Sequence, residues 1–142
     1  MDTVPADKRS EIMRRITSKG TKPEIQVRRL VHSLGFRYRL HKKELLGKPD
    51  LVFSNRRKLI FVHGCFWHQH DGCKSSHIPK TRQEYWEPKL TRTVRRDREN
   101  QKKLYELGWD ILVIWECEVR DIQKLAERIM VFLGGNRLPS NK

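Results

Sequence analysis

Residues 63–84 form a long polar segment between a short apolar run and an amphipathic stretch, and this segment most restricts how the chain can fold. It is rich in His, Cys, Gly, Ser and Pro, a composition typical of loops. A loop of this length needs something to hold it in a compact domain. Cys65, His70 and Cys73 have the spacing of metal ligands, and Cys117 follows a later apolar run. We therefore expect a structural zinc site in which four protein ligands leave no open position.

Two alternatives remain for this zinc site. His68 competes with His70 for the histidine position, because spacing alone does not separate them. The thiols can also be buried without a metal, since free cysteine is common in protein cores. Disulfides are disfavoured by the odd number of cysteines and by an N-terminus unlike a secretory signal. No apolar run approaches the length of a membrane span, so we expect a cytoplasmic protein without a membrane partner.

Apolar patterning outside this segment predicts one α/β domain over residues 1–134. The expected helices cover about 7–17, a stretch that begins with a capping box of Thr21 and Glu24 and stops at Gly35, about 88–107, and 122–133. The expected strands cover 36–40, the hairpin runs 51–53 and 59–62, and a central strand over 109–115. This order predicts a small mixed sheet flanked by helices on both faces. Residues 135–142 are expected to form a disordered tail.

The net charge of +14 is concentrated in two parts of the chain. Residues 1–43 hold 12 Lys or Arg against four Asp or Glu, and residues 74–103 hold ten against four. A segregated basic surface of this kind is suited to neutralising the phosphates of a nucleic acid. We expect the basic segment 1–20 to contact DNA. A basic protein associated with ribosomes or acting as a chaperone is the alternative that charge alone allows.

Two carboxylates and two adjacent aromatic residues are candidates for function. Asp50 begins an apolar run, where it can equally be an ordinary turn residue. Asp97 lies on the apolar face of its expected helix, where it needs a partner, either a metal or an ion pair with a neighbouring arginine. Phe66 and Trp67 are suited to stacking on bases, or to packing at the edge of the sheet.

Several motifs, in order along the chain, resemble those of the very short patch repair (Vsr) DNA mismatch endonucleases. The most specific is the string HGCFWH at residues 63–68. It is accompanied by Arg9-Ser10 with Met13-Arg14, Glu24 near a helix start, Gly47-Lys48-Pro49-Asp50, Tyr85-Trp86, Arg96-Asp97-Arg98 and the run from Leu107 to Cys117.

The resemblance implies a restriction-endonuclease-like fold, a variant of the PD-(D/E)xK core, with catalytic Mg²⁺ and a separate structural Zn²⁺. Asp50 matches the metal-binding aspartate of the family, and the backbone carbonyl of Val62 is the second expected magnesium ligand. The usual (D/E)xK positions read Phe61-Val62-His63 here, without an acid or a lysine. Val62 also stands where members of the family often have threonine.

The resemblance also assigns roles to the remaining site residues. His68 matches the general base and Asp97 the acid that partners it. Glu24 and His63 match polar residues around the metals. The side chains that match those wedged into the duplex beside the mismatch are Met13, Phe66, Trp67 and Trp86.

The activity implied by the resemblance is Mg²⁺-dependent nicking of DNA at T·G mismatches, which arise by deamination of 5-methylcytosine. The T-containing strand is cut 5′ of the mismatched T, in double-stranded DNA at a bacterial nucleoid, with a functional link to a cytosine-5 DNA methyltransferase. Without a coiled-coil pattern in the sequence, we expect a monomer. Two other interpretations are a restriction-type duplex endonuclease of the same fold and a non-catalytic, zinc-stabilised DNA-binding module.

Overall fold

The computed structural model describes residues 22–40 and 45–134. The expected helix over 7–17, the basic segment 1–20 with Met13, Thr21 and the expected tail over 135–142 lie outside these ranges.

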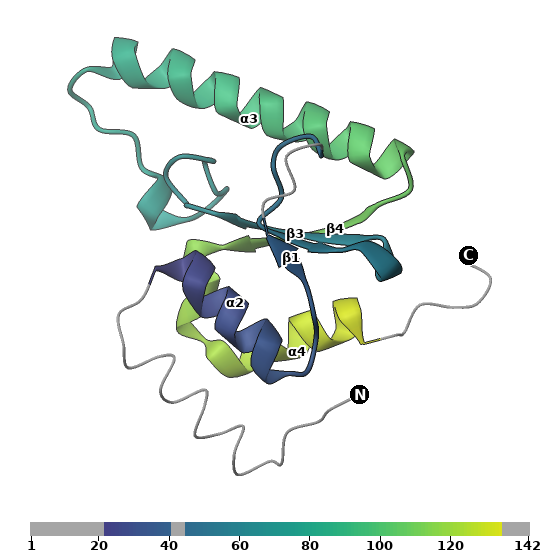
Figure 1. The fold of residues 1–142 in the computed structure, drawn as a ribbon. Helices are drawn as coiled ribbons and strands as arrows, with labels where there is room; N and C mark the ends of the chain where they lie inside the picture. Colours follow the sequence, from purple (N-terminus) through teal and green to yellow (C-terminus); the bar gives the residue numbers. More distant parts are fainter. Residues whose placement is uncertain (1–21, 41–44, 135–142) are drawn as a thin grey trace.

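A four-stranded sheet forms the centre of the described part (Figure 1). Its order is β1 (Arg39–Leu40), β2 (Leu51–Phe53), β3 (Lys58–His63) and β4 (Asp110–Trp115). β1, β2 and β3 pair antiparallel, whereas β3 and β4 are parallel. The predicted hairpin of two apolar runs is therefore confirmed. A parallel pair needs a long crossover, and the polar loop together with helix α3 (Gln83–Glu106) provides it.

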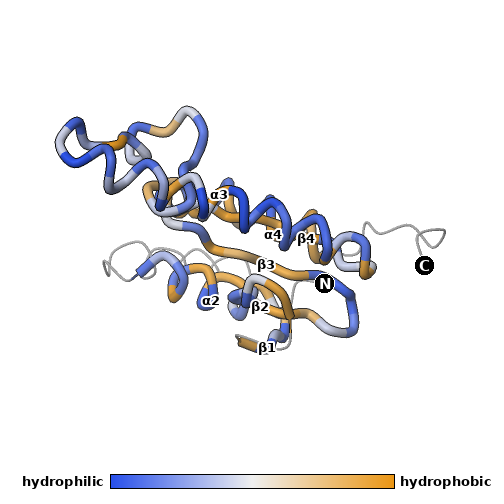
Figure 2. Tube along the Cα trace, turned by 90° about the horizontal axis from the view of Figure 1, so that it is seen from above, coloured by the Kyte–Doolittle hydropathy of each residue, from blue (hydrophilic) through white to orange (hydrophobic). Residues whose placement is uncertain are grey.

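Helices cover both faces of the sheet, as the sequence predicts. Helices α2 (Pro23–Ser33) and α4 (Ile122–Leu133) lie on one face, and α3 lies on the other (Figure 1). Alternate residues of β3 face opposite sides, so Ile60 joins the larger core with α2 and α4 whereas Leu59 joins the smaller core with α3. Figure 2 shows β3 coloured as hydrophobic along most of its length, between the mostly hydrophilic α3 and the mixed α2. No helix in the described ranges is long and apolar enough to cross a membrane.

The predicted strands at the two edges of the sheet need correction. The expected strand over 36–40 is reduced to the two residues of β1, because Phe36 is buried in the larger core and its N–H donates to the Val31 carbonyl at the end of α2. The sequence predicts a central strand at β4, but in the described part of the chain β4 pairs with β3 alone and lies at an edge. Its apolar run contacts helices on both faces, because Ile114 is buried in the larger core whereas the partly buried Ile111 and Val113 pack against the smaller one.

Two helix starts also differ from the predictions. The N-cap of α2 is Lys22, whose side chain makes no capping hydrogen bond. Thr21 lies outside the described residues, so its capping box with Glu24 stays a prediction. Pro23 occupies the first helical position, where its fixed φ favours a helix start without a side-chain cap. Helix α3 begins at Gln83 instead of Pro88. The additional turn carries Trp86, whose ring packs against Phe66 with a centroid distance of 5.2 Å.

Basic residues in the turn between β2 and β3 and at the first position of β3 bind the carboxyl ends of two helices. Arg56 donates to the Leu133 carbonyl at 2.7 Å, and buried Lys58 donates to the Phe132 carbonyl, both at the end of α4. Arg57 donates to the Leu107 carbonyl at the end of α3, 2.8 Å away. Cations at helix carboxyl termini satisfy free carbonyls and interact favourably with the helix dipole. These three positive charges therefore have a structural role.

Candidate active site and metal centre

The parallel strands β3 and β4 end side by side, and the candidate site is built around their ends. His63, the last residue of β3, pairs with Trp115, the last residue of β4. Two residues after each strand comes a cysteine, Cys65 after β3 and Cys117 after β4. The register thus brings residues from distant parts of the sequence to the carboxyl ends of neighbouring strands, where α/β sheets commonly carry their sites.

The first cluster at these strand ends contains the four residues predicted as zinc ligands. The Sγ atoms of Cys65, Cys73 and Cys117 and one nitrogen of His70 lie within 4.8 Å of one another. His70 Nδ1 is 3.7 Å from Cys65 Sγ and 3.4 Å from Cys117 Sγ. A tetrahedral zinc with ordinary bond lengths separates a sulfur and a nitrogen ligand by about 3.5 Å. Three thiols and one imidazole in this arrangement therefore fit that ion.

The thiols of this cluster differ in their affinity for a proton. The backbone N–H of Ser75 lowers the pKa of Cys73 to about 7, which favours the thiolate that binds metals. Burial raises the pKa of Cys65 to about 12, and burial also raises the pKa of Cys117. Thiols with raised pKa values become thiolates beside a positive charge, which a bound divalent ion supplies.

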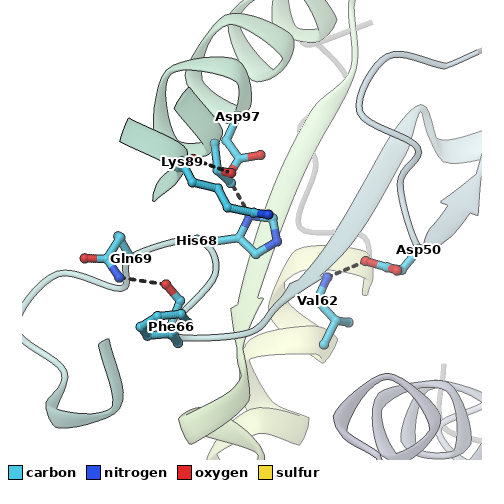
Figure 3. A network of polar contacts seen from close by, with 8 residues as sticks. Asp50, Val62, Phe66, His68, Gln69, Lys89 and Asp97 are labelled. Carbon is cyan, nitrogen blue, oxygen red and sulfur yellow. Dashed lines mark hydrogen bonds and ion pairs between the residues drawn. The ribbon is translucent and has the colours of Figure 1, made fainter. Parts of the chain in front are cut away.

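The second cluster contains His68 and Asp97, and its main contact joins the loop to α3 (Figure 3). His68 Nδ1 lies 2.6 Å from Asp97 Oδ2, and the two side chains are 28% and 24% exposed. The turn that carries His68 is closed by a hydrogen bond from its N–H to the Gly64 carbonyl at 3.1 Å. Because the carboxylate accepts the Nδ1 proton, Nε2 remains as the free basic nitrogen.

These contacts distinguish between two sets of alternatives that the sequence left open: which histidine joins the cysteines, and which partner Asp97 has. The structure brings His70 to the three cysteines and directs His68 to Asp97. Asp97 does lie between the apolar residues of α3, and its partner among the described residues is this histidine instead of a neighbouring arginine.

His63 lies buried beneath the His68 ring. The two rings are stacked, with centroids 3.8 Å apart and planes within 7°. Burial, with a smaller contribution from the neighbouring His68, lowers the pKa of His63 to about 4, so its ring is neutral at pH 7. Within the described ranges its buried Nδ1 has no hydrogen-bond partner.

The stacking also indicates what this second cluster can do. His63, His68 and Asp97 each bring a possible ligand atom within 4.8 Å of the others. However, the lone pair of an imidazole nitrogen lies in the plane of its own ring, and two nearly parallel planes 3.8 Å apart do not meet at one ion. The cluster is therefore better suited to proton transfer than to chelation.

Asp50 lies at the start of β2, beside the edge of β3 opposite to β4. Its N–H donates to the Ile60 carbonyl at 3.1 Å, and its Oδ2 accepts from the Val62 N–H at 2.6 Å (Figure 3). The preceding turn needs Gly47, whose φ is +75° and whose added Cβ would lie 3.3 Å from the Phe61 ring. The turn thus holds the Asp50 carboxylate at the edge of β3. There the carboxylate accepts a structural hydrogen bond and can also take part in a reaction.

The remaining predicted residues are arranged as follows. Glu24 is half-buried in the first turn of α2, which packs against β3 and η3 (Glu116–Arg120). Phe66, Trp67 and Trp86 form one aromatic cluster, with centroid distances of 5.3 Å (66–67), 5.2 Å (66–86) and 5.7 Å (67–86). Trp67 is 50% exposed. Met13 lies outside the described residues.

Sequence reasoning gave no role to Trp115, which lies between the two clusters. Its ring stacks on His70 and meets the edge of His63. The signal that was available is the pair of apolar strands that are each followed, two residues later, by a cysteine. Only the parallel register shows that these two strand ends are neighbours.

Comparisons with known proteins place this chain in a family. The profile of the family described as DNA mismatch endonuclease Vsr matches residues 1–74. The Type II nicking enzyme V.XorIIP of Xanthomonas oryzae pv. oryzae is 44% identical over 128 residues, which cover 90% of this chain and 93% of that protein. The DNA mismatch endonuclease Vsr of Escherichia coli is 39% identical over 122 residues, covering 86% and 78%. This chain belongs to the Vsr family. It is an endonuclease.

The segment of this Vsr-family endonuclease that matches the profile contains Asp50, the HGCFWH string and three of the four clustered side chains that could hold a metal ion. Asp97 and Cys117 come from beyond that segment. The structure places Asp97 on His68 and Cys117 on His70, so the second half of the chain completes both clusters.

Proposed function

We propose that this chain recognises T·G mismatches in double-stranded DNA and nicks the T-containing strand 5′ of the mismatched T, with Mg²⁺ as its catalytic metal. The observation that carries the proposal is the 2.6 Å contact of His68 with Asp97. His68 directly follows Phe66 and Trp67 of the aromatic cluster, and Trp67 is 50% exposed. A histidine oriented by a carboxylate is a common general base. The relatives named as mismatch endonuclease and nicking enzymes support the same chemistry.

The magnesium site is proposed at Asp50 and Val62. Carboxylate and carbonyl oxygens are ligands that Mg²⁺ prefers. The Val62 N–H donates to Asp50 Oδ2 at 2.6 Å, and the N–H and C=O of one residue in an extended strand point to the same edge. The Val62 carbonyl and the Asp50 carboxylate therefore share one side of β3. When bound there, Mg²⁺ supplies stabilisation of the negative charge that develops at the scissile phosphate.

The protein's own residues are proposed to provide the proton transfer. His68 removes a proton from the attacking water through Nε2, while Asp97 holds the ring in the required tautomer and stabilises the imidazolium that forms. Neutral His63 supports the buried face of the His68 ring and keeps water from it. Glu24 is proposed as a further polar residue near the metals.

Discrimination of the mismatch is assigned to the aromatic cluster of Phe66, Trp67 and Trp86, with Met13 as a further wedge. Inserting side chains between base pairs costs a few kcal/mol of stacking. A T·G wobble pair is weaker than a Watson–Crick pair, so this deformation costs less at the mismatch. The exposed basic residues of α3 would hold phosphates and fix the register on the duplex; they are Lys89, Arg92, Arg95, Arg96, Arg98, Lys102 and Lys103.

The mixed sheet is proposed to be a restriction-endonuclease-like core that has lost the usual (D/E)xK pair. The Cys65, His70, Cys73 and Cys117 cluster would hold a structural Zn²⁺ that ties the loop to both strand ends. The protein would act as a monomer on DNA in which a cytosine-5 methyltransferase has produced 5-methylcytosine.

A strand-resolved nicking assay tests this function. Duplexes that differ only in one T·G, T·A or C·G pair, labelled on either strand and placed in several flanking contexts, are incubated with Mg²⁺ or with EDTA. We expect a single cut 5′ of the T, in the T·G duplex only and with Mg²⁺ only. Cutting of both strands in all duplexes would support a restriction-type enzyme. Binding of DNA without cutting in any context would support a DNA-binding module.

A further inference from the structure

A continuous series of aromatic contacts joins the metal centre to the candidate general base. The His70 ring lies flat on Trp115, with centroids 4.3 Å apart and planes within 8°. Trp115 meets His63 edge to face at 5.3 Å and 74°. His63 in turn stacks on His68 at 3.8 Å, and His68 contacts Asp97 at 2.6 Å.

The surroundings of Trp115 indicate that its ring has a role other than filling a core. Neither of the two apolar cores in the described part includes it, and its ring contacts are with His63 and His70. Its backbone is held independently of the ring, because its N–H donates to Glu118 Oε1 at 2.8 Å and Glu118 is in turn paired with Arg128 at 2.6 Å. The indole therefore stands on a fixed backbone between two histidines.

The backbone alone does not explain how the His68 ring is held. His68 and His70 lie in one turn, closed by a hydrogen bond from the His70 N–H to the Cys65 carbonyl at 2.9 Å. This turn fixes where the Cα of His68 lies, whereas the ring direction is set by Asp97 on one side and by the stacked His63 beneath it. His63 itself has no hydrogen bond on its buried Nδ1 within the described residues, so its ring is held by its packing neighbours.

We propose that Trp115 is a positioning residue that couples the Cys65, His70, Cys73 and Cys117 centre to the His63–His68 pair. A metal bound through His70 Nδ1 fixes the His70 ring, which holds the indole. The indole then fixes His63 as the platform of His68. This inference rests on the proposed function, since it assigns to His68 the role of base.

Steady-state nicking kinetics of zinc-loaded variants test whether Trp115 affects the rate of the reaction. We expect Trp115→Leu to lower kcat by about tenfold or more, because small displacements of a catalytic group cost that much or more, while KM for the duplex and the bound zinc stay as in the wild type. Trp115→Phe, which keeps a flat ring, should recover most of the rate. Trp109→Leu is the matched control, since Trp109 is buried beside the other end of β4. It should lower Tm without lowering kcat.

Intrinsic fluorescence gives a second readout that does not depend on activity. The measurement is made in a chain that carries Trp67→Phe and Trp86→Phe, because Trp67 lies on the loop that the metal would hold and its indole packs on Trp86. If His70 couples the metal to Trp115, removing zinc with a chelator should change the emission of this chain and of its Trp109→Phe variant. The same treatment should leave the emission of its Trp115→Phe variant nearly unchanged. A kcat of Trp115→Leu equal to that of the wild type would contradict the proposal. So would an emission change that persists in Trp115→Phe.

Failure of this inference is distinguishable from failure of the proposed function. If the wild type nicks no T·G duplex, the proposed function is wrong, and the fluorescence result still decides whether Trp115 is coupled to the metal centre. If the wild type nicks but Trp115→Leu is as fast, only the coupling is wrong.

Discussion

At the scale of single residues, the His68–Asp97 contact is the one whose loss should most affect the chemistry. Replacing Asp97 by Asn removes an oxygen that accepts the Nδ1 proton at 2.6 Å, so the ring loses its preferred tautomer. We expect kcat to fall by about 10² to 10⁴, the usual contribution of an oriented general base, with little change in KM. Single-turnover nicking measures this effect. Glu99→Gln, an exposed carboxylate on the same helix, is the control and should keep the wild-type rate.

The side chain of Phe66 is expected to affect the discrimination between mismatched and paired DNA. Its ring contacts both Trp67 and Trp86, so Phe66→Ala should disorganise the wedge and lose a stacking contact worth about 1–3 kcal/mol. We expect the ratio of affinities for T·G and T·A duplexes to fall by about tenfold or more. Tyr105→Ala removes an exposed aromatic residue of α3 and should leave the ratio unchanged. An unchanged ratio of affinities in Phe66→Ala would show that Phe66 is not part of the wedge.

At the scale of elements, the cluster of Cys65, His70, Cys73 and Cys117, proposed to bind zinc, connects the ends of β3 and β4 to the loop. Cys117→Ser replaces a thiolate ligand by a hydroxyl that binds zinc poorly, so we expect the zinc content to drop well below one ion per chain and Tm to fall. Val119→Ala, in the same 3₁₀ segment, creates a cavity at a residue that is 4% exposed. This control should lower Tm and keep the metal. A full zinc content in Cys117→Ser would show that another residue is the fourth ligand.

The turn between β2 and β3 gives a separate prediction about stability. Arg57 donates to the Leu107 carbonyl at 2.8 Å and lies over the Trp109 ring, 4.3 Å from its centroid. Arg57→Ala removes both contacts and should lower the free energy of unfolding by about 1 kcal/mol, with the urea m-value unchanged. Arg92→Ala, exposed on α3, should have no measurable effect. Equal urea midpoints for the two variants would contradict a stabilising role of Arg57 at the carboxyl end of α3.

Local sequence signals predicted the elements better than their boundaries and partners. The hairpin and α4 follow from apolar periodicity, and the structure has both. The start of α3 could not be predicted in the same way, because a proline usually marks a helix start and the turn before it is stabilised by the distant Phe66. Similarly, spacing could not separate His68 from His70. Their different directions depend on Asp97 and Cys117, which only the folded chain brings near.

At the scale of the whole molecule, the charge distribution predicts a strong effect of salt. The net charge is +14, and α3 carries many exposed basic residues. If these neutralise several phosphates, affinity for a duplex without a mismatch should fall by on the order of a thousandfold between about 50 and 200 mM salt. A titration of fluorescent duplex at several salt concentrations measures the slope. A slope near zero would contradict a phosphate-binding role for this surface.

The most direct test of the central claim is strand-resolved nicking of a T·G duplex in Mg²⁺ by the wild type, Asp50→Ala and His68→Ala, with duplex affinity measured in parallel. The account predicts one cut in the T strand by the wild type. It also predicts the loss of that cut in both variants, while their affinity for the mismatched duplex is retained. Rapid nicking by either variant would remove that residue from the mechanism, and undiminished nicking by both would contradict the proposed catalytic centre.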